Sequence, residues 1–215
     1  MSYLSMNILQ SSIFIFTIGI ITLLGGACNP KTEGKFTEEE LSLINKADSI
    51  MRVLTIADSA DNEVLRSNCS DFSREALLSE DYARLEKLMV ATVTHPSQDG
   101  VGIAGPQVGL KRRVVAVQRF DKEGEPFEVY PNIRITWASD SLEAGPEGCL
   151  SVPNRRGDVK RSQEIVIEYA DMEALRSGKA VDGVPMRKET IKDFTAVIFQ
   201  HEADHLDGVL YIDRL

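Results

Sequence analysis

The chain has 215 residues, of which 43% are hydrophobic and 27% are charged, and its formal net charge is −9. This length suits one domain with extensions, and the composition is ordinary for a soluble globular protein. The negative charge argues against a nucleic acid or an anionic membrane surface as a partner bound through bulk electrostatics.

The first 30 residues carry no charged side chain, and residues 13–24 form a nearly unbroken apolar run. This run is too short to cross a bilayer as an ordinary helix, but it suits the apolar core of a signal peptide. Small residues precede Cys28, as they do at the processing site of bacterial lipoproteins. We therefore expect residues 1–28 to be a leader, with Cys28 as the lipidated end of a membrane-anchored, extracytoplasmic lipoprotein.

Two features of this leader depart from the lipoprotein pattern. No Lys or Arg precedes the apolar run, and Gly25 stands where a larger aliphatic residue is usual. An uncleaved anchor or a misassigned start therefore remains an alternative, and with it a cytoplasmic location.

Residues 29–50 are expected to form a polar tether and a short helix, because Thr37 and the acidic residues after it resemble a helix N-cap and first turn. Its apolar side would consist of Leu41, Ile44 and Ile50. The catalytic domain is expected to span residues 51–215. Within it, residues 80–93 show helical periodicity, and His95 lies in a loop by composition, where we expect it to be solvated.

The segment 100–109, GVGIAGPQVG, is rich in glycine. Such a run can bind phosphate where it joins a strand to a helix, but here Pro106 interrupts it and no Lys-Ser or Lys-Thr pair follows. We favour the other use of glycine, which is to let the backbone approach a ligand closely. Strands are predicted at 113–120, 127–130, 133–137 and 164–169. Several strands before one dominant helix indicate an α+β fold, with mostly antiparallel sheets packed around that helix.

The dominant helix carries the motif HEADH at residues 201–205. Positions i and i+4 share one face of a helix, so both imidazoles can reach one metal ion. The same helical stripe includes Phe194, Val197 and Ile198. Glu202 lies beside the stripe, where a general base for an activated water belongs. Gly208 is expected to end the helix.

Ordinary core or surface histidines are the alternative, but two of the three histidines in the chain fall in this one motif. A catalytic metal usually has three protein ligands and one position open to water. Metzincins have a third histidine where this chain has Tyr211, and the chain ends at Leu215, too soon for the later glutamate of the thermolysin type. The best upstream candidate is Cys149, for which a disulfide with Cys69 is the alternative role.

Three segments carry further information when they are taken together: 100–107 (GVGIAGPQ), 147–151 (EGCLS) and 200–205 (QHEADH). They resemble the three motifs of the peptide deformylase family, in the same order and at comparable spacing. The similarity runs from about Met51 to the C-terminus. One departure is visible, because the family's first motif usually has Ala-Ala where this chain has Ala104-Gly105.

This resemblance implies a site for one divalent metal ion, with the ligands Cys149, His201 and His205. It implies Glu202 as general acid and base, and it implies that Gln107 and the backbone N–H of Leu150 bind the formyl oxygen. The implied reaction is removal of the formyl group from N-formyl-methionyl peptides, with release of formate. Fe²⁺ is the first candidate for the ion, and Zn²⁺ or Ni²⁺ are alternatives, Zn²⁺ especially if the protein is exported.

The same segments suggest how a substrate would be held. Gly102 and Gly105 are expected to allow close approach of the backbone to the small formyl group. The methionine side chain is expected to lie against four residues, which are Val101, Phe194, Val197 and Ile198. Arg156 is expected to contact the peptide backbone. Plain core packing is the alternative for the four apolar residues, and an exposed salt bridge is the alternative for Arg156.

Two other functions remain open at this stage. An exported protein would not meet nascent chains, which are made in the cytosol, so the chain could be an extracytoplasmic metallo-amidohydrolase of related acyl peptides. A non-catalytic binder of formyl peptides on the same scaffold is the second alternative, although every catalytic residue type is present.

Overall fold

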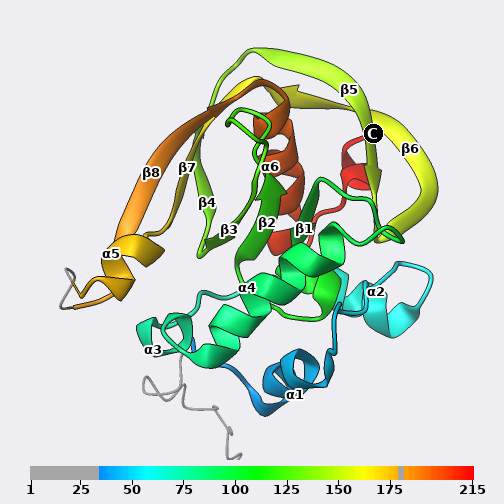
Figure 1. The fold of residues 1–215 in the computed structure, drawn as a ribbon. Coiled ribbons are helices and arrows are strands. Elements are labelled where there is room, and N and C mark those ends of the chain that lie inside the picture. The colour runs from blue at the N-terminus through cyan, green and yellow to red at the C-terminus, as the bar shows by residue number, and fades with distance from the viewer. Residues whose placement is uncertain (1–33, 179–181) are drawn as a thin grey trace, which may run out of the picture.

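The computed structural model describes residues 34–178 and 182–215 (Figure 1). The predicted leader at 1–28, Cys28 and the first part of the tether lie outside the described residues. Among the described residues, none of the helices combines the length and the hydrophobicity that a membrane crossing requires.

Helix α1 (Glu38–Lys46) begins with the predicted cap, because Thr37 accepts a hydrogen bond from the backbone of Glu40 and the Glu40 carboxylate accepts one in return. The helix ends at Lys46, so the prediction that Ile50 belongs to it is wrong. The chain leaves the helix in an extended conformation, and the N–H of Met51 then donates to the hydroxyl of Thr92 in α4.

Three helices follow α1: α2 (Ser59–Leu65), α3 (Arg74–Leu77) and α4 (Glu80–Val93). The last of these has the predicted bounds, and the hydroxyl of Ser79 caps it. Its buried face includes Leu85, Met89 and Val93, which pack into the largest apolar cluster of the described residues. Figure 1 shows these helices gathered on one side of the molecule, with the sheets on the other.

The strands form three sheets, and the pairing within each is antiparallel, which confirms the predicted sheet type. The first contains β1 (Gly102–Ala104), β2 (Val114–Gln118) and β3 (Phe127–Pro131), and the second contains β4 (Arg134–Ala138), β7 (Glu164–Ala170) and β8 (Met186–Lys192). The third is a hairpin of β5 (Leu142–Cys149) and β6 (Val152–Ser162). Short helical segments complete the described fold: η1 (Gly105–Val108), α5 (Met172–Arg176) and η2 (Tyr211–Arg214).

The β5–β6 hairpin and β8 were not predicted from the sequence. Glycine and proline interrupt β5, and most residues of both hairpin strands are exposed, so the apolar alternation that marks a half-buried strand is missing. In β8 only Ile191 is buried.

Helix α6 (Asp193–Leu206) carries the HEADH motif and lies in the middle of the fold, against β1 and β2 on one side and near the other two sheets (Figure 1). Its buried side includes Ala196, Phe199 and Leu206. Gly208 ends it as predicted, with a φ of 71°. A Cβ atom at Gly208 would lie 2.4 Å from the carbonyl oxygen of Arg66, so only glycine fits here.

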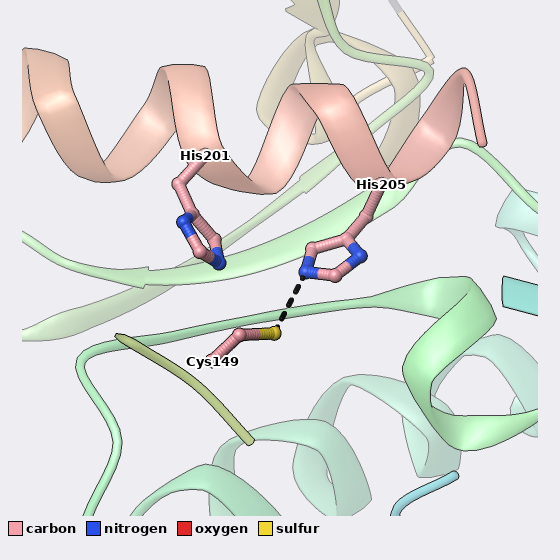
Figure 2. A group of neighbouring side chains, drawn as sticks. All are labelled: Cys149, His201 and His205. Atoms are coloured by element: carbon pink, nitrogen blue, oxygen red, sulfur yellow. Dashed lines mark hydrogen bonds between the residues drawn. The ribbon is translucent and has the colours of Figure 1, made fainter. Parts of the chain in front are cut away.

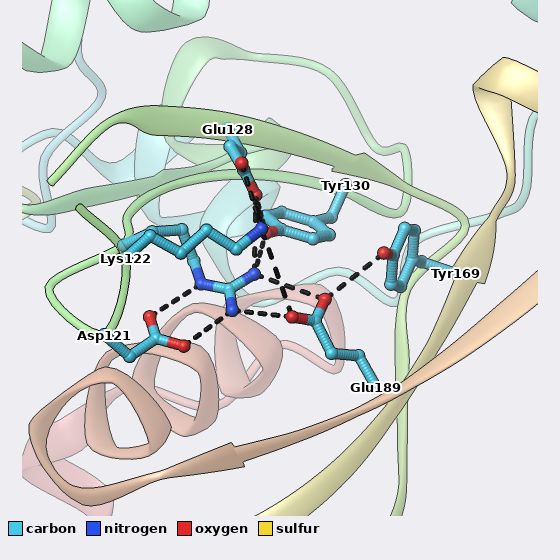
Figure 3. Close-up of polar contacts among 7 residues, drawn as sticks. Asp121, Lys122, Glu128, Tyr130, Tyr169 and Glu189 are labelled. Atoms are coloured by element: carbon cyan, nitrogen blue, oxygen red, sulfur yellow. Dashed lines mark hydrogen bonds and ion pairs between the residues drawn. The ribbon is translucent and has the colours of Figure 1, made fainter. Parts of the chain in front are cut away.

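A buried ionic group, which we call the Arg119 cluster, joins the first two sheets beside α6 (Figure 3). Arg119 follows β2 and has only 1% of its surface exposed. It donates to carboxylates from three different segments, namely Asp121, Glu128 on β3 and Glu189 on β8. Because β8 leads directly into α6, this cluster ties the start of the central helix to the sheet that carries β1 and β2.

Candidate active site

The structure brings the three predicted metal ligands together (Figure 2). Cys149 ends β5, and His201 and His205 lie one turn apart on α6. Their ligand atoms all lie within 4.8 Å of one another, and the Cys149 Sγ is 3.3 Å from the His205 Nε2. Both Cys149 and Cys69 are free thiols, so the alternative of a disulfide between them is not formed.

The donor set fits a divalent ion in size and in chemistry. Tetrahedral coordination by sulfur and nitrogen places the two donor atoms about 3.6 Å apart, close to the separation found here. His205 is 1% exposed, and its Nδ1 has no hydrogen-bond partner among the described residues. Burial, together with the positive charges of His201 and Arg161, lowers the pKa of His205 well below its usual range. His205 is therefore a neutral imidazole, which is the form that binds a metal.

The orientation of His201 is set by Glu147, whose role the sequence analysis missed. The Glu147 Oε2 lies 2.7 Å from the His201 Nδ1, which leaves the Nε2 to face Cys149. Burial acts to lower the pKa of His201, but hydrogen bonds to Cys149 and Glu147 outweigh it and raise the pKa to about 10. The Glu147 carboxylate that favours a proton on His201 also favours a cation bound by that ring. The second nitrogen of a metal-binding histidine usually donates to an acceptor, and a carboxylate is one of the common acceptors.

Glu147 is held in turn by Arg161, a buried residue of β6. The guanidinium donates to both carboxylate oxygens of Glu147 and also to Asp204. Burial acts to raise the pKa of Glu147, but the hydrogen bonds from His201 and Arg161 lower it to about 2. The general need of a ligand histidine for an acceptor on its other nitrogen would have singled out this carboxylate, two residues before Cys149.

Glu202 is 3% exposed, and its Oε2 has no hydrogen-bond partner among the described residues. Burial raises its pKa to about 7, although the positive charge of His201 opposes the rise. Gly102 makes room for this carboxylate, because a Cβ atom there would lie 2.4 Å from the Glu202 Oε1. Gly102 thus allows the close approach of a side chain of the protein itself, and the predicted approach to a formyl group stays a prediction.

Gln107, in η1, has its carboxamide fixed in one orientation. Its oxygen accepts a hydrogen bond of 2.8 Å from the N–H of Ala104, so its NH₂ group points toward the Cys149 sulfur and the Ser151 hydroxyl, at 3.5 Å and 3.3 Å. The N–H of Leu150 has no backbone acceptor among the described residues. Two donors therefore lie beside the cluster: the Leu150 N–H, which has no backbone acceptor, and the Gln107 NH₂ group, which contacts the sulfur and the hydroxyl. Donors of this kind stabilise an oxygen that gains negative charge.

An extended segment before α2 holds the two loops that carry these donors. The N–H of Leu54 donates to the carbonyl of Gln107, and the N–H of Ile56 donates to the carbonyl of Ser151. Both hydrogen bonds join backbone groups, so no side-chain pattern in the sequence could have predicted them.

A cavity of about 760 Å³ opens onto the cluster. Its wall includes Cys149, His201, Glu202, Gln107 and Leu150. The predicted substrate residues on its wall are Val101, Gly102, Arg156, Phe194, Val197 and Ile198. Val101 and Phe194 are 37% and 55% exposed, so the cavity wall offers apolar surface that a ligand can cover.

Gly105 is the one predicted substrate residue that the structure does not place on the cavity wall. A Cβ atom there would lie 2.5 Å from the carbonyl oxygen of Arg112 and 3.0 Å from that of Leu110. The need for glycine at this position is therefore explained by packing within the chain, and not by a ligand.

One thiol, two imidazoles and a buried carboxylate of raised pKa lie beside a cavity whose wall also carries the Gln107 carboxamide and the Leu150 residue. This arrangement defines a hydrolase with a candidate metal site. The sequence model of the family "Polypeptide deformylase" matches residues 50–215. The peptide deformylase of Leptospira biflexa is 36% identical over 161 residues, which cover 72% of this chain and 83% of the relative. Peptide deformylase 2 of a Nostoc species is 44% identical over 133 residues, covering 59% and 68%.

Solved structures agree with this assignment. The class I type b peptide deformylase of Acinetobacter baumannii with bound Met-Ala-Ser gives a TM-score of 0.65 at 29% identity, covering 79% of this chain and 100% of that one. The Thermotoga maritima enzyme gives 0.63 at 29% identity, covering 77% and 97%. The chain belongs to the peptide deformylase family, and it is an enzyme of that family.

Proposed function

We propose that this chain hydrolyses the formyl group of N-formyl-methionyl peptides and releases formate. The observation that carries the proposal is the fixed carboxamide of Gln107, whose NH₂ group points at the Cys149–His201–His205 cluster from the side of the cavity. The exposed apolar side chains of Val101 and Phe194 at the cavity support a methionine side chain as the neighbouring group.

The proposed chemistry assigns a separate task to each residue. Glu202 takes a proton from the attacking water, whose oxygen bonds to the formyl carbon, and returns that proton to the amine nitrogen as the carbon–nitrogen bond breaks. A carboxyl group with a pKa of about 7 can do both near neutral pH. Gln107 and the N–H of Leu150 donate to the formyl oxygen as it gains charge; loss of one such donor typically costs about 10²–10³-fold in kcat.

One divalent ion is proposed to be held by Cys149, His201 and His205. Such an ion would polarise the formyl carbonyl and lower the pKa of the attacking water. Fe²⁺ remains the first candidate, with Zn²⁺ or Ni²⁺ as alternatives, because thiolate and imidazole suit all three. Elemental analysis of the purified protein, and reloading of a chelator-treated sample with each metal in turn, distinguishes them.

Formate release is the direct test of the proposed reaction. We expect the purified enzyme to release formate from formyl-Met-Ala-Ser amide and to leave acetyl-Met-Ala-Ser amide intact. Turnover of the acetyl peptide at a similar rate would favour the broader amidohydrolase. Binding of the formyl peptide without formate release would favour the binder and would refute the proposed reaction.

We also propose attachment to a membrane through Cys28, outside the cytoplasm. The apolar run at 13–24 and the small residues before Cys28 support it. Mass spectrometry of the mature N-terminus tests this, since a lipidated Cys28 is expected and an intact Met1 would contradict it.

A further inference from the structure

Two adjacent arginines on β6, Arg155 and Arg156, lie on the wall of the active-site cavity. Both are exposed. Every other arginine in the parts of the chain that the structure describes donates from its side chain to a carboxylate or to a backbone carbonyl. Among the arginines of the described residues, Arg155 and Arg156 are the two that form neither an ion pair nor a side-chain hydrogen bond. Their N–H groups are therefore available to a ligand.

An irregularity in the β5–β6 hairpin brings this pair to the cavity. Glu147 pairs with Gly157 and Cys149 pairs with Val152, so four residues of β6 lie opposite the single residue Gly148. Asn154, within this bulge, has a φ of 61°. Bulges of this kind redirect side chains beside active sites. The Cγ atom of Arg156 lies 3.6 Å from the Cβ position of Gly148, the residue before the ligand Cys149.

The two arginines set the charge of this part of the cavity wall. The acidic residues on the cavity wall are Asp99, Glu147 and Glu202. Glu147 is paired with Arg161 and Glu202 is buried, which leaves the exposed Asp99 against two arginines. This part of the wall is therefore positive in a protein whose net charge is −9.

We propose that Arg155 and Arg156 form a carboxylate-binding subsite, which makes the enzyme prefer formyl peptides that carry a carboxylate two or three residues after the formyl end. This inference rests on the proposed deformylation. An extended peptide advances about 3.3 Å per residue, so its second and third residues lie about 7–10 Å from the formyl group, within reach of an arginine beside Gly148. Arginine suits this task, because its planar fork of donors matches a carboxylate.

The carboxylate has two sources, which are the C-terminus of a short peptide and an acidic side chain within a longer one. Three substrates separate them: formyl-Met-Ala-Ser with a free C-terminus, its C-terminal amide, and formyl-Met-Ala-Asp amide. We expect the free acid to show a kcat/KM about three- to tenfold above that of the Ser amide, as for one or two solvent-exposed ion pairs. The difference should lie mainly in KM and should shrink as salt is raised to about 0.5 M. If the kcat/KM of the Asp amide matches that of the free acid, the subsite recognises acidic side chains as well as the C-terminus. If it matches that of the Ser amide, the subsite recognises the C-terminal carboxylate only.

Variants of the chain test the assignment to these two residues. In Arg155→Gln and Arg156→Gln, the ratio of kcat/KM for acid over amide is expected to fall toward 1. Lys160→Gln removes a positive charge from an exposed residue of the same strand that does not line the cavity, and it should keep the wild-type ratio. Equal kcat/KM for all three substrates, or a preference that survives in both arginine variants, would overturn the subsite. Failure to release formate from any of the three would instead overturn the proposed function.

Discussion

Replacement of Glu147 by glutamine tests how this chain holds its metal site. The carboxylate accepts three hydrogen bonds, two from Arg161 and one shared with His201. The amide of Glu147→Gln is nearly the same shape, but it carries no charge and turns one acceptor into a donor. The Arg161 side chain, 4% exposed, would then keep only the Asp204 carboxylate as a charged partner. Breaking a buried ion pair in this way costs about 3–5 kcal/mol of unfolding free energy.

The same change should weaken metal binding about 10- to 100-fold, because His201 loses the acceptor that fixes its ring. Urea unfolding gives the stability of the metal-free protein, and competition with a chromophoric chelator gives the metal affinity. Glu143→Gln is the matched control, since Glu143 is exposed on the same strand and forms no ion pair among the described residues. If Glu147→Gln resembles this control in both measurements, the reasoning from the Glu147–Arg161 pair is refuted.

Three further changes test other parts of the structure. Glu202→Ala should bind metal normally but lose about 10²–10⁴-fold in kcat, measured as formate release, and an active variant would contradict its role as proton carrier. Gly102→Ala places a Cβ atom 2.4 Å from the Glu202 Oε1 and should displace it, lowering kcat about a hundredfold, whereas Gly145→Ala, with nothing within 4 Å of its added Cβ, should behave as wild type. The Arg119 cluster predicts a pH effect on stability. The hydrogen bond from Arg119 lowers the pKa of Asp121. The contribution of this pair to the unfolding free energy is therefore fully present above the unfolded pKa of about 3.9, and it is lost as pH falls through the lower folded pKa. Arg119→Met should lower the unfolding free energy by about 3 kcal/mol at pH 7, which is the low end for a buried pair because the partner carboxylates are partly solvated. The loss should be smaller at pH 3, and an equal loss at both pH values would contradict this prediction.

The parts of the fold that could be predicted are those whose signal is local. The cap at Thr37, the bounds of α4 and the glycine that ends α6 each depend on residues within one or two turns, and each is confirmed. The predicted strands at 113–120, 127–130, 133–137 and 164–169 correspond to β2, β3, β4 and β7, whose apolar residues are continuous or alternate.

The parts that could not be predicted depend on partners far along the chain. The β5–β6 hairpin has little apolar alternation, and Glu147 gains its role only because folding brings it to His201, 54 residues later. Gly102 and Gly105 illustrate the same limit. Both appear in one glycine-rich run, but one makes room for the Glu202 carboxylate and the other for backbone carbonyls.

Glu147 and Glu202 lie on the wall of the same cavity, and their surroundings give the two carboxylates different properties. Glu147 and Glu202 are both buried, at 8% and 3% exposed, so burial alone would raise the pKa of each. Arg161 and His201 reverse that effect at Glu147, where the pKa falls to about 2, while Glu202 has no direct partner on its Oε2 and its pKa rises to about 7. A carboxylate that stays charged can hold an imidazole in place, and one that titrates near neutral pH can carry a proton. The hydrogen bonds from His201 and Arg161, which reach Glu147 and not the Oε2 of Glu202, therefore account for the different pKa values, and this difference supports Glu202 as the proposed proton carrier.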